Sequence, residues 1–523
     1  MTMNPILLEL LKNAFSAVPE EMGAVLKRTA FSPNIKERMD ASCAIFDAQG
    51  RMLAQAEHIP VHLGAMPLTV AFAITVFPAL QEGDQIVVND PYHGGSHLPD
   101  LTVLKPVFFA GAIAGYVVNR AHHADIGGIS PGSMPGTSTD IFQEGLIIPP
   151  CRLVARGQEN RDVFALIRSN TRTPTERIGD IRAQIAANNL GERRVVELIS
   201  KYSRATYQAF TERITAYSER RMRHAIMAMP NGTFIAEDVL DDDGITGAPV
   251  KLVVAVTITD DTIAIDFEGT DRQRAGNINA PYAVTLSAVY YVLRAVTDPG
   301  IPPNYGCYLP VTVHVPVGTV LNPVHPAAVA SGNVETAQRI VDVLLLALYK
   351  ALPHTVPAQS QGTMNNVAIG GRIGDSGECF SYYETIAGGQ GALPYKDGED
   401  GIHTHMTNTA NTPIEALELA YPLRIEAYEL IPGSGGAGRF SGGRGVRRAL
   451  RILTDHATLS IQSDRRTYPP KGLDGGADGR AGQNYLLRDG KRMDLPAKVT
   501  MTLERGDLVV IETPGGGGYG AVP

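Results

Sequence analysis

The chain has 523 residues, a formal net charge of −8 at pH 7, and charged side chains at 19% of its positions. This length allows two to four domains with a large buried core. The acidic balance argues against a general nucleic-acid surface, which would be basic. The four cysteines form no CxxC pair, so reduced thiols are expected rather than a disulfide framework. No cationic leader or membrane-length apolar run is present, so we expect a cytoplasmic protein without membrane contact.

The pattern along the chain predicts a multi-domain protein of mixed α/β or α+β class. An N-terminal domain over residues 1–230 would hold the main polar cluster and a long helical tract. A central α/β domain is expected over residues 231–431, and a β-rich domain over residues 432–523. The last region is rich in glycine, which permits turns with positive φ. Its basic residues are expected to bind an anion or a partner chain: Arg439, Arg444, Arg447 and Arg448.

Residues 4–28 are predicted to form an amphipathic helix, because their apolar side chains recur at helical spacing. Pro19 is expected to interrupt this helix. A β-hairpin should follow around a turn at residues 47–50. Glu37 and Asp40 precede the hairpin, and either carboxylate could reach a metal or serve as a base. Pairing of Glu37 with Arg38 is an equally good interpretation of the spacing.

Polar chemistry is concentrated between Asn89 and Gly128, around an apolar segment with β-branched and aromatic runs typical of strands. Gly111 and Gly115 mark the expected turn. A hairpin returns its second end beside its first, so the loops HGGSHLPD and RAHHADIGG are expected to meet. The polar residues of this region are His93, His97, His122, His123, Asp90, Asp100 and Asp125.

Neutral imidazole together with carboxylate suits a divalent transition metal such as manganese, zinc or iron. Two histidines and one aspartate leave positions open, as a metal requires if it is to activate water or polarise a carbonyl. We therefore predict that His97, Asp100 and His122 bind a metal. His123 and Asp125 are alternates or residues that support the ligands. The alternative is that these side chains only satisfy backbone groups in turns.

Asp140 and Glu144 lie in a loop, PGSMPGTSTDIFQEGLIIPP, that is expected to form a wall of the pocket. From Thr175 to Met229 the pattern predicts the longest helical tract, suited to packing or subunit contact. Strands are expected over VKLVVAVTI and TIAIDFEGT, and helices over APYAVTLSAVYYVLRAV and the region after SGNVET. No GxxxxGK[ST] motif occurs, so a nucleotide site on this chain is not expected.

A second polar region runs from Tyr383 to Glu429 and contains His403 and His405. At this spacing the two histidines would share one face of an extended segment. We interpret the region as substrate-pocket wall or acid/base machinery, with a structural loop network as the alternative. His62 lies in a turn ahead of an expected helix and is assigned no role.

Several motifs, in the same order along essentially the whole chain, resemble the hydantoinase B/5-oxoprolinase B family: NDPYHGGSHLPDL, NRAHHADIGG, IFQEGLIIPP, GNVETAQRIVD, DGIHTHMTNTANTPIE and PGGGGYG. The resemblance implies one subunit of a two-component ATP-dependent amidohydrolase for hydantoins, oxoproline or other lactams. A hydantoinase A-type partner with an actin-like ATPase fold would use ATP and Mg²⁺ to phosphorylate the ring amide oxygen. This subunit would then hydrolyse the activated ring, within a hetero-oligomer such as an α2β2 assembly.

The alpha subunit of acetone carboxylase is a related branch, in which two histidines and one aspartate hold manganese. That resemblance implies the same ligands here, on His97, Asp100 and His122. We assign proton transfer, as a hypothesis, to three residues: His123, Glu37 and His403. Substrate contact is assigned in the same way to Asp40, Asp125, His405 and Glu144.

Two competing functions remain. A ketone carboxylase subunit would share the metal and the ATP-using partner but form a C–C bond, and would depend on bicarbonate. A non-catalytic scaffold would only stabilise the ATPase subunit, and the density of histidine and aspartate in two clusters argues against it.

Overall fold

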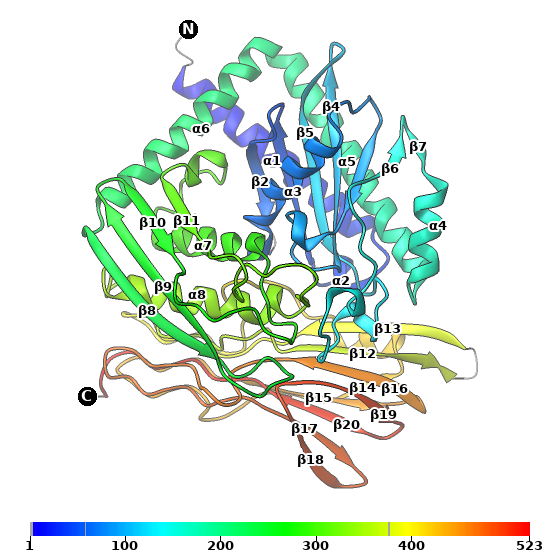
Figure 1. Cartoon of the computed structure of the whole chain (residues 1–523), viewed down its shortest axis with the longest axis vertical. Helices are drawn as coiled ribbons and strands as arrows, with labels where there is room; N and C mark the ends of the chain where they lie inside the picture. Colours follow the sequence, from blue (N-terminus) through cyan, green and yellow to red (C-terminus); the bar gives the residue numbers. More distant parts are fainter. Residues whose placement is uncertain (1–3, 58, 375–376, 523) are drawn as a thin grey trace.

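The computed structural model describes residues 4–57, 59–374 and 377–522, and Figure 1 shows their arrangement. The chain forms a seven-stranded sheet, a four-stranded sheet beside it, and two further sheets stacked near the C-terminus. Helices cover the first two sheets. The mixed α+β, multi-domain architecture expected from the sequence is therefore confirmed.

The seven-stranded sheet has the order β2-β1-β5-β4-β3-β6-β7, and its neighbouring strands are antiparallel. Its central strands are buried on both faces, which explains why they appear in the sequence as nearly continuous apolar runs. The strands are β1 (Ala41–Asp47), β2 (Met52–Glu57), β3 (Gln85–Val88), β4 (Asp100–Phe109), β5 (Ala112–His122), β6 (Cys151–Ala155) and β7 (Gln158–Glu159).

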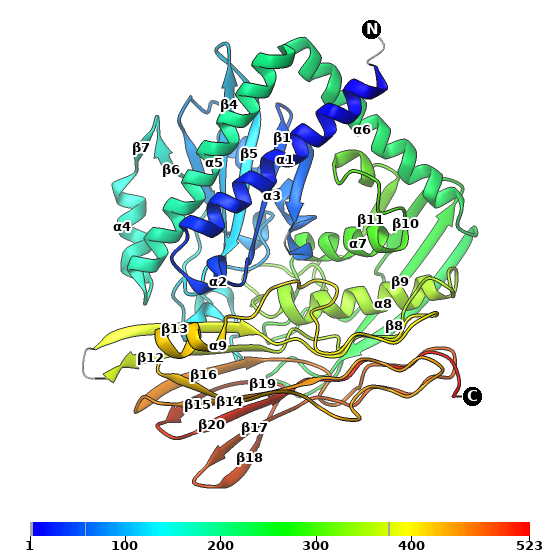
Figure 2. The same ribbon diagram turned by 180° about the vertical axis from the view of Figure 1, so that it is seen from behind.

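Two long helices, α1 (Pro5–Thr29) and α5 (Pro174–Tyr202), cross one face of this sheet, as Figure 2 shows. Asn4 caps α1 by accepting a hydrogen bond from the backbone N–H of Ile6. The expected interruption at Pro19 is wrong. Pro19 is buried within an unbroken α1, where packing against the sheet and α5 outweighs the missing backbone N–H. The shorter helices α2 (Pro33–Lys36) and α4 (Arg161–Asn170) flank this layer.

The four-stranded sheet has the order β11-β10-β9-β8 and carries α8 on its inner face. Helix α7 packs against both α8 and α3. Helix α6 follows α5 in the chain and runs along the edge of the sheet. Apolar side chains from all of these elements form one core. The elements are α3 (Ala65–Val76), α6 (Arg204–Met227), β8 (Gly232–Leu240), β9 (Val250–Thr259), β10 (Thr262–Asp266), α7 (Tyr282–Val296), β11 (Val311–His314) and α8 (Ala337–Tyr349).

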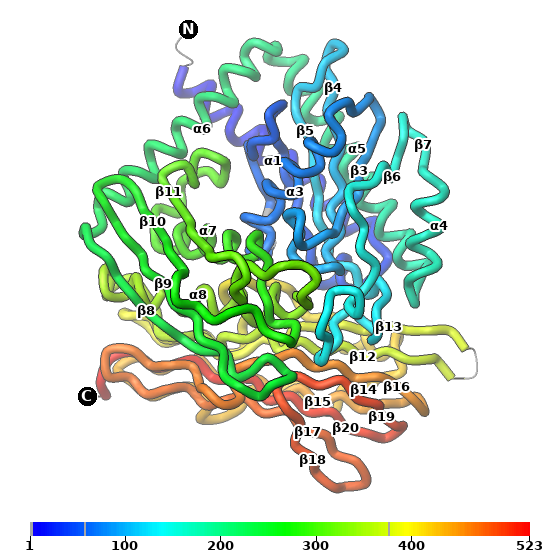
Figure 3. Tube along the Cα trace, in the orientation of Figure 1, coloured from blue at the N-terminus to red at the C-terminus, as the bar shows by residue number. Residues whose placement is uncertain are grey.

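Two stacked sheets with a shared apolar core form the lower layers in Figure 3, with orders β13-β12-β16-β19 and β14-β15-β20-β17-β18. Strand β12 pairs with β16, so strands from both sides of residue 432, the expected domain boundary, belong to one sheet. The division of the chain into three domains stays a prediction. The elements are β12 (Asn366–Ile373), β13 (Glu378–Thr385), α9 (Ile414–Ala420), β14 (Leu423–Leu430), β15 (Val446–Ile452), β16 (His456–Gln462), β17 (Gln483–Arg488), β18 (Lys491–Leu495), β19 (Lys498–Glu504) and β20 (Leu508–Glu512).

The basic residues of the C-terminal region form ion pairs within the chain. Arg444 pairs with Asp400 at 2.6 Å, and Arg447 pairs with Glu429 at 2.7 Å. Arg448 lies fully buried beside Glu384, at 3.2 Å. Carboxylates of the same fold thus neutralise these three arginines, and binding of an anion or a partner chain by this cluster stays a prediction.

The glycine-rich C-terminal tail is held by close backbone packing. A Cβ atom on Gly516 would collide with the carbonyl oxygen of Gln390, so only glycine fits at this crossing. The tail thereby packs closely on the backbone around Gln390, in the segment that precedes residues 403–409. Among the described residues, no helix is both long and apolar enough to cross a membrane.

Candidate metal centre and adjoining chamber

The β4–β5 hairpin brings two of the predicted ligands together. Asp100 begins β4 and His122 ends β5, and the two are direct partners in the antiparallel register. The turn at Ala110 and Gly111 has positive φ at both positions, as a tight two-residue hairpin requires. Gly115, in contrast, lies inside β5. The expected meeting of the two polar loops is confirmed.

His97 completes the group from the turn before β4, where its carbonyl accepts the backbone N–H of Asp100 at 3.1 Å. One side-chain ligand atom from each of His97, Asp100 and His122 lies within 4.8 Å of the others. All three side chains are buried. This group could hold a metal ion.

Three atoms in this group have no hydrogen-bond partner within the described chain: Nε2 of His97, Nε2 of His122 and Oδ1 of Asp100. Nε2 of His97 lies 3.3 Å from Oδ1 of Asp100. Buried polar atoms are rarely left unpaired in folded proteins. Two imidazole nitrogens and a carboxylate oxygen are ligands that manganese, zinc and iron accept, so the residues present fit such a metal.

The second carboxylate oxygen of Asp100 is held by three neighbours. Oδ2 accepts a short hydrogen bond from the hydroxyl of Ser96 and a longer one, at 3.4 Å, from the amide of Asn333. Nε2 of His62 lies 3.5 Å away. These contacts fix the carboxylate plane and leave Oδ1 facing the two histidines.

The two histidine rings are also held in place. Nδ1 of His97 lies 3.3 Å from the carbonyl oxygen of Ala330, so it donates there and leaves Nε2 free as a ligand. The amide nitrogen of Asn34 lies 2.8 Å from Nδ1 of His122. The other side of the His122 ring stacks on Tyr383, with ring centroids 4.7 Å apart.

Electrostatics in the cluster favour ionised Asp100 beside neutral His122. Burial opposes the charged carboxylate, but His97 and His62 together outweigh it and hold the pKa of Asp100 well below its usual range. Burial, reinforced by His97, lowers the pKa of His122 strongly. For His97 burial lowers the pKa, but the charge and hydrogen bond of Asp100, together with the carbonyl of Ala330 and the charge of Asp40, outweigh it and the net change is upward. Burial raises the pKa of Asp40 to about 7.

A small cavity of about 20 Å³, which we call the ligand cavity, lies against this cluster. That volume suits a single water molecule or ion. Its wall comes from distant parts of the chain, and includes Asp40, His62, Asn333, Tyr383, Thr385, Thr407 and Thr409.

Arg38 ties these distant segments together. Its guanidinium donates to Oδ1 of Asn34 at 2.7 Å, to the carbonyl oxygen of Tyr383 at 2.8 Å and to the hydroxyl of Thr385 at 2.8 Å. The same side chain therefore links the residue that positions His122 to strand β13, in the layer below the hairpin (Figure 1).

A second cavity, of about 700 Å³, adjoins the ligand cavity, and we call it the chamber. Thr407 lines both cavities, and Pro60 of the chamber lies between Ile59 and Val61, which line the ligand cavity. His403 and His405 form part of the chamber wall, as the sequence suggested for a pocket. Burial lowers their pKa values to about 3 and about 4.

Of the other predicted site residues, Asp40 lies on the ligand cavity and Glu37 does not. Glu37 is half-buried at the end of α2, and the guanidinium of Arg38 points instead to Asn34 and Thr385. The structure thus separates the two carboxylates that the sequence treated as equivalent.

Two residues next to the hairpin also lie away from the ligand cavity. His123 points toward α5, where Nε2 lies 3.0 Å from the side-chain oxygen of Gln184. Asp125 accepts backbone N–H groups of Gly127 and Gly132, at 3.1 and 3.2 Å, and pairs with Arg172 at 2.9 Å. Both side chains hold neighbouring segments in place.

Glu144 is buried and supports a ligand through the backbone. It accepts the N–H groups of Val329 and Ala330, each at 3.0 Å, and the hydroxyl of Ser138 at 2.9 Å. Ala330 in turn bonds Nδ1 of His97. Burial raises the pKa of Glu144 to about 7. Glu144 is therefore placed to position His97 and does not line either cavity.

Four residues of this site were not predicted from the sequence: Asn34, His62, Asn333 and Tyr383. A histidine in the apolar turn EHIPVHLG was a usable signal for His62. The other three reach the cluster only through tertiary packing, and their local sequence carries no such signal.

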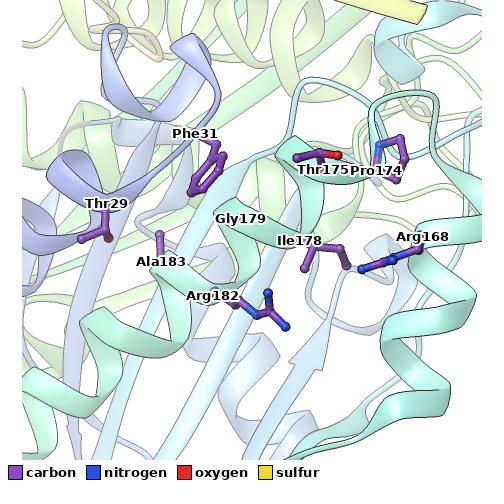
Figure 4. A pocket seen from close by; sticks show the side chains of 9 residues that line it. All are labelled: Thr29, Phe31, Arg168, Pro174, Thr175, Ile178, Gly179, Arg182 and Ala183. Atoms are coloured by element: carbon purple, nitrogen blue, oxygen red, sulfur yellow. The ribbon is translucent and has the colours of Figure 1, made fainter. Parts of the chain in front are cut away.

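A separate hollow of about 380 Å³ lies where the end of α1 meets α5 (Figure 4). Phe31, Ile178 and Ala183 give it an apolar floor, and Arg168 and Arg182 stand at its edge. Its described lining has no histidine, cysteine or carboxylate, so it offers no catalytic or metal-binding group.

A family model described as Hydantoinase B/oxoprolinase matches residues 4–522. An uncharacterised protein of Methanocaldococcus jannaschii is 45% identical, over 99% of this chain and 91% of its own length. The B-type subunit of a putative D-/L-hydantoinase from Pseudomonas sp. is 33% identical, over 99% of this chain and 90% of its own. The 5-oxoprolinase of Dictyostelium discoideum is 39% identical, and the chain spans only 40% of that longer protein.

Two solved structures share the fold. A crystal structure of an ATP-dependent caprolactamase from Pseudomonas jessenii matches with a TM-score of 0.92 and 30% identity, over 100% of this chain and 92% of that one. A nucleotide-free acetone carboxylase also matches with a TM-score of 0.92, over 99% of this chain and 76% of that one. Its identity is 21%, so this second likeness shows the fold alone.

Proposed function

Because the chain belongs to the hydantoinase B/oxoprolinase family, we propose that it is the hydrolytic subunit of an ATP-dependent enzyme that opens a cyclic amide. A hydantoinase A-type subunit would phosphorylate the ring amide oxygen in a hetero-oligomer, for which we propose an α2β2 form. The names of a hydantoinase subunit and a caprolactamase among the related proteins support this assignment. The observation that carries it is the buried His97, Asp100 and His122 group beside a chamber of about 700 Å³.

The partnership has a chemical reason. Direct hydrolysis of an unstrained lactam is slow, because the amide nitrogen is a poor leaving group and the carbonyl carbon is weakly electrophilic. Phosphorylation of the carbonyl oxygen makes that carbon more reactive and provides a phosphate leaving group. The B-type subunit then has to place the activated ring beside a water molecule and move protons.

His97, Asp100 and His122 would hold a divalent manganese, zinc or iron ion in this scheme. Such an ion supplies Lewis-acid chemistry, polarising a substrate oxygen or lowering the pKa of water. Ser96, Asn333 and Asn34 orient the ligands from behind.

The chain's own polar side chains would handle substrate and protons. Asp40, on the wall of the ligand cavity, would accept a proton from the attacking water. His403 faces the chamber, where its uncharged ring would hydrogen-bond to the amide of the substrate. His405 would contact the substrate from the same wall.

Ring opening by the complex with the A-type subunit tests this proposal. We expect ATP- and amide-dependent product formation, which the variant His97→Ala abolishes. His93→Ala is the matched control, because His93 lies in the same loop but is exposed and stacks on Phe72. Near-normal ring opening by His97→Ala would contradict the assignment. Product formation that requires bicarbonate and a ketone would instead identify a carboxylase subunit.

A further inference from the structure

The wall of the chamber carries no formal charge. Its lining among the described residues contains no lysine, arginine, aspartate or glutamate, and its polar members carry hydroxyl, amide or imidazole groups. The outer part of this wall is open to solvent, since Tyr395 is 66% exposed and His354, Thr355 and Asn408 are exposed. The inner part ends at buried Thr407, beside the ligand cavity.

The polar atoms of this wall that are buried without a hydrogen-bond partner in the described chain belong to His403, His405 and Thr404. Within the part of the chain that the structure describes, both ring nitrogens of His403 are buried without a partner, and so is Nε2 of His405. Nδ1 of His405 lies 3.3 Å from the hydroxyl of Tyr291. Burial keeps the pKa of both rings far below neutrality, so each ring is uncharged and offers one donor or acceptor role at each nitrogen.

A cyclic amide is complementary to this arrangement. Its ring holds C=O and N–H side by side on one edge, and the amide carries no charge. Neutral imidazoles with unused nitrogens can donate to the carbonyl and accept from the N–H. Buried polar atoms that lack partners in the protein gain them from such a ligand.

A carboxylate on the ring would find no cationic partner among the residues that line the chamber. An ion moved from water into this chamber would meet no cationic side chain among the residues that line it, and transfer of an unpaired charge is strongly unfavourable. The phosphoryl group of an activated amide, in contrast, would have a partner of opposite charge. The divalent cation that His97, Asp100 and His122 would hold supplies its counter-charge at the inner end.

We propose that the chamber selects uncharged cyclic amides and discriminates against those that bear a carboxylate on the ring, such as 5-oxoproline. This inference rests on the proposed function and narrows its substrate class. In this proposal, His403 and His405 form hydrogen bonds with the C=O and N–H groups of the ring amide. The absence of a cation in the wall is what excludes the acid.

Two matched pairs of amides test the selectivity in the complex with the A-type subunit. 2-Pyrrolidinone and 5-oxoproline differ only by the ring carboxylate, and hydantoin is compared with hydantoin-5-acetic acid. We expect kcat/KM for the neutral member of the accepted pair to exceed that of the acid by about 100-fold at pH 8. At this pH exposed histidines are ordinarily neutral.

A charge-introduction variant provides an independent check. Asn408→Arg places a cation at the exposed mouth of the chamber, where a longer side chain can be accommodated. It should raise kcat/KM for the acid relative to that for the neutral amide about tenfold. Leu419→Arg, at a position 91% exposed on α9 outside the chamber, should leave the ratio unaltered.

Each outcome bears on one of the two proposals. Equal or better turnover of the carboxylated amides by the wild-type complex would overturn the selectivity and leave the hydrolase assignment standing. Failure to open any of the four amides, or larger neutral lactams, would remove the proposed function and this inference with it. An unchanged ratio in Asn408→Arg would show that charge in the wall does not determine the choice.

Discussion

Asp100 and His122 face each other across the open end of the β4–β5 hairpin as direct register partners. Their relative position is therefore set by the backbone hydrogen bonds of two long strands and does not depend on a flexible loop. His97 joins them from a turn closed onto the backbone of Asp100. A group built this way is held near its binding geometry before any ion arrives.

The metal content of the protein should depend on His97, Asp100 and His122. We expect a near-stoichiometric transition metal in the purified wild-type protein, because the three unpaired ligand atoms converge in a buried position. Elemental analysis should show its loss in His97→Ala and in Asp100→Ala. His93→Ala should keep the metal. An equal metal content in all four proteins would remove the ion from this site.

Asn34 should influence metal affinity without contacting the ion. Its amide lies against Nδ1 of His122, so Asn34→Ala frees that ring to rotate. Loss of such a supporting contact typically weakens metal binding 10- to 100-fold, roughly, and we expect a decrease of that size. Competition with a chelator measures it. Asn170→Ala, which removes an exposed asparagine that bonds only within its own helix, is the control; an unchanged affinity in Asn34→Ala would contradict the positioning role.

Asp125 should matter for stability and not for substrate affinity. Its buried carboxylate pairs with Arg172 and with backbone N–H groups, away from both cavities. Asp125→Ala leaves these donors unpaired, at a cost on the order of 3 kcal/mol in the free energy of unfolding. Urea denaturation gives this value, and KM should stay the same. A large rise in KM with unchanged stability would instead support the substrate-binding role that the sequence suggested.

Stability should depend on pH through Glu335. Burial raises the pKa of this carboxyl from its ordinary value to about 7, while it accepts from the backbone of Met364 and the amide of Asn366. Between the unfolded value near 4.5 and the folded value, the folded state binds the extra proton. The contribution of Glu335 is thus fully present below pH 4.5 and is lost as pH rises toward 7.

The variant Glu335→Gln isolates this contribution. An amide resembles the protonated acid, so wild type and variant should be similarly stable at pH 5, and the variant more stable by a few kcal/mol at pH 8. This size follows from about 1.4 kcal/mol for each unit of pKa difference. Urea unfolding at both pH values measures it. Glu9→Gln, at an exposed position, should keep the wild-type slope, and an identical slope in Glu335→Gln would disprove the effect.

The grouping of His97, Asp100 and His122 could be predicted from the sequence because the three residues are close along the chain or joined by one hairpin. His97 and Asp100 are three residues apart, and His122 returns through one hairpin whose strands and turn are evident from residue type. The direction of the His123 side chain was not predicted, although the alternation of side chains along a strand indicates it. Successive strand residues point to opposite faces, so a buried His122 on one face sends His123 toward α5 on the other.

The remainder of the site depends on tertiary packing. Asn333 arrives with the turn before α8, and Tyr383 with β13, and neither has a neighbour in sequence that marks its role. Asp40 and Glu37 are three residues apart, yet only Asp40 reaches the ligand cavity. Which carboxylate points inward is decided by the path of the chain between α2 and β1, and residue type alone does not encode that path.

The bond from Arg38 to the carbonyl of Tyr383 spans 345 residues of sequence. During synthesis, all three ligand residues leave the ribosome long before β13 and residues 407–409 exist. There is thus an interval in which the hairpin can form while the enclosing wall is absent, and a cation can reach the ligands from open solvent. Completion of the chain then adds the part of the ligand cavity wall that β13 and residues 407–409 provide, so this cavity is complete only after its metal-ligand candidates have long been made.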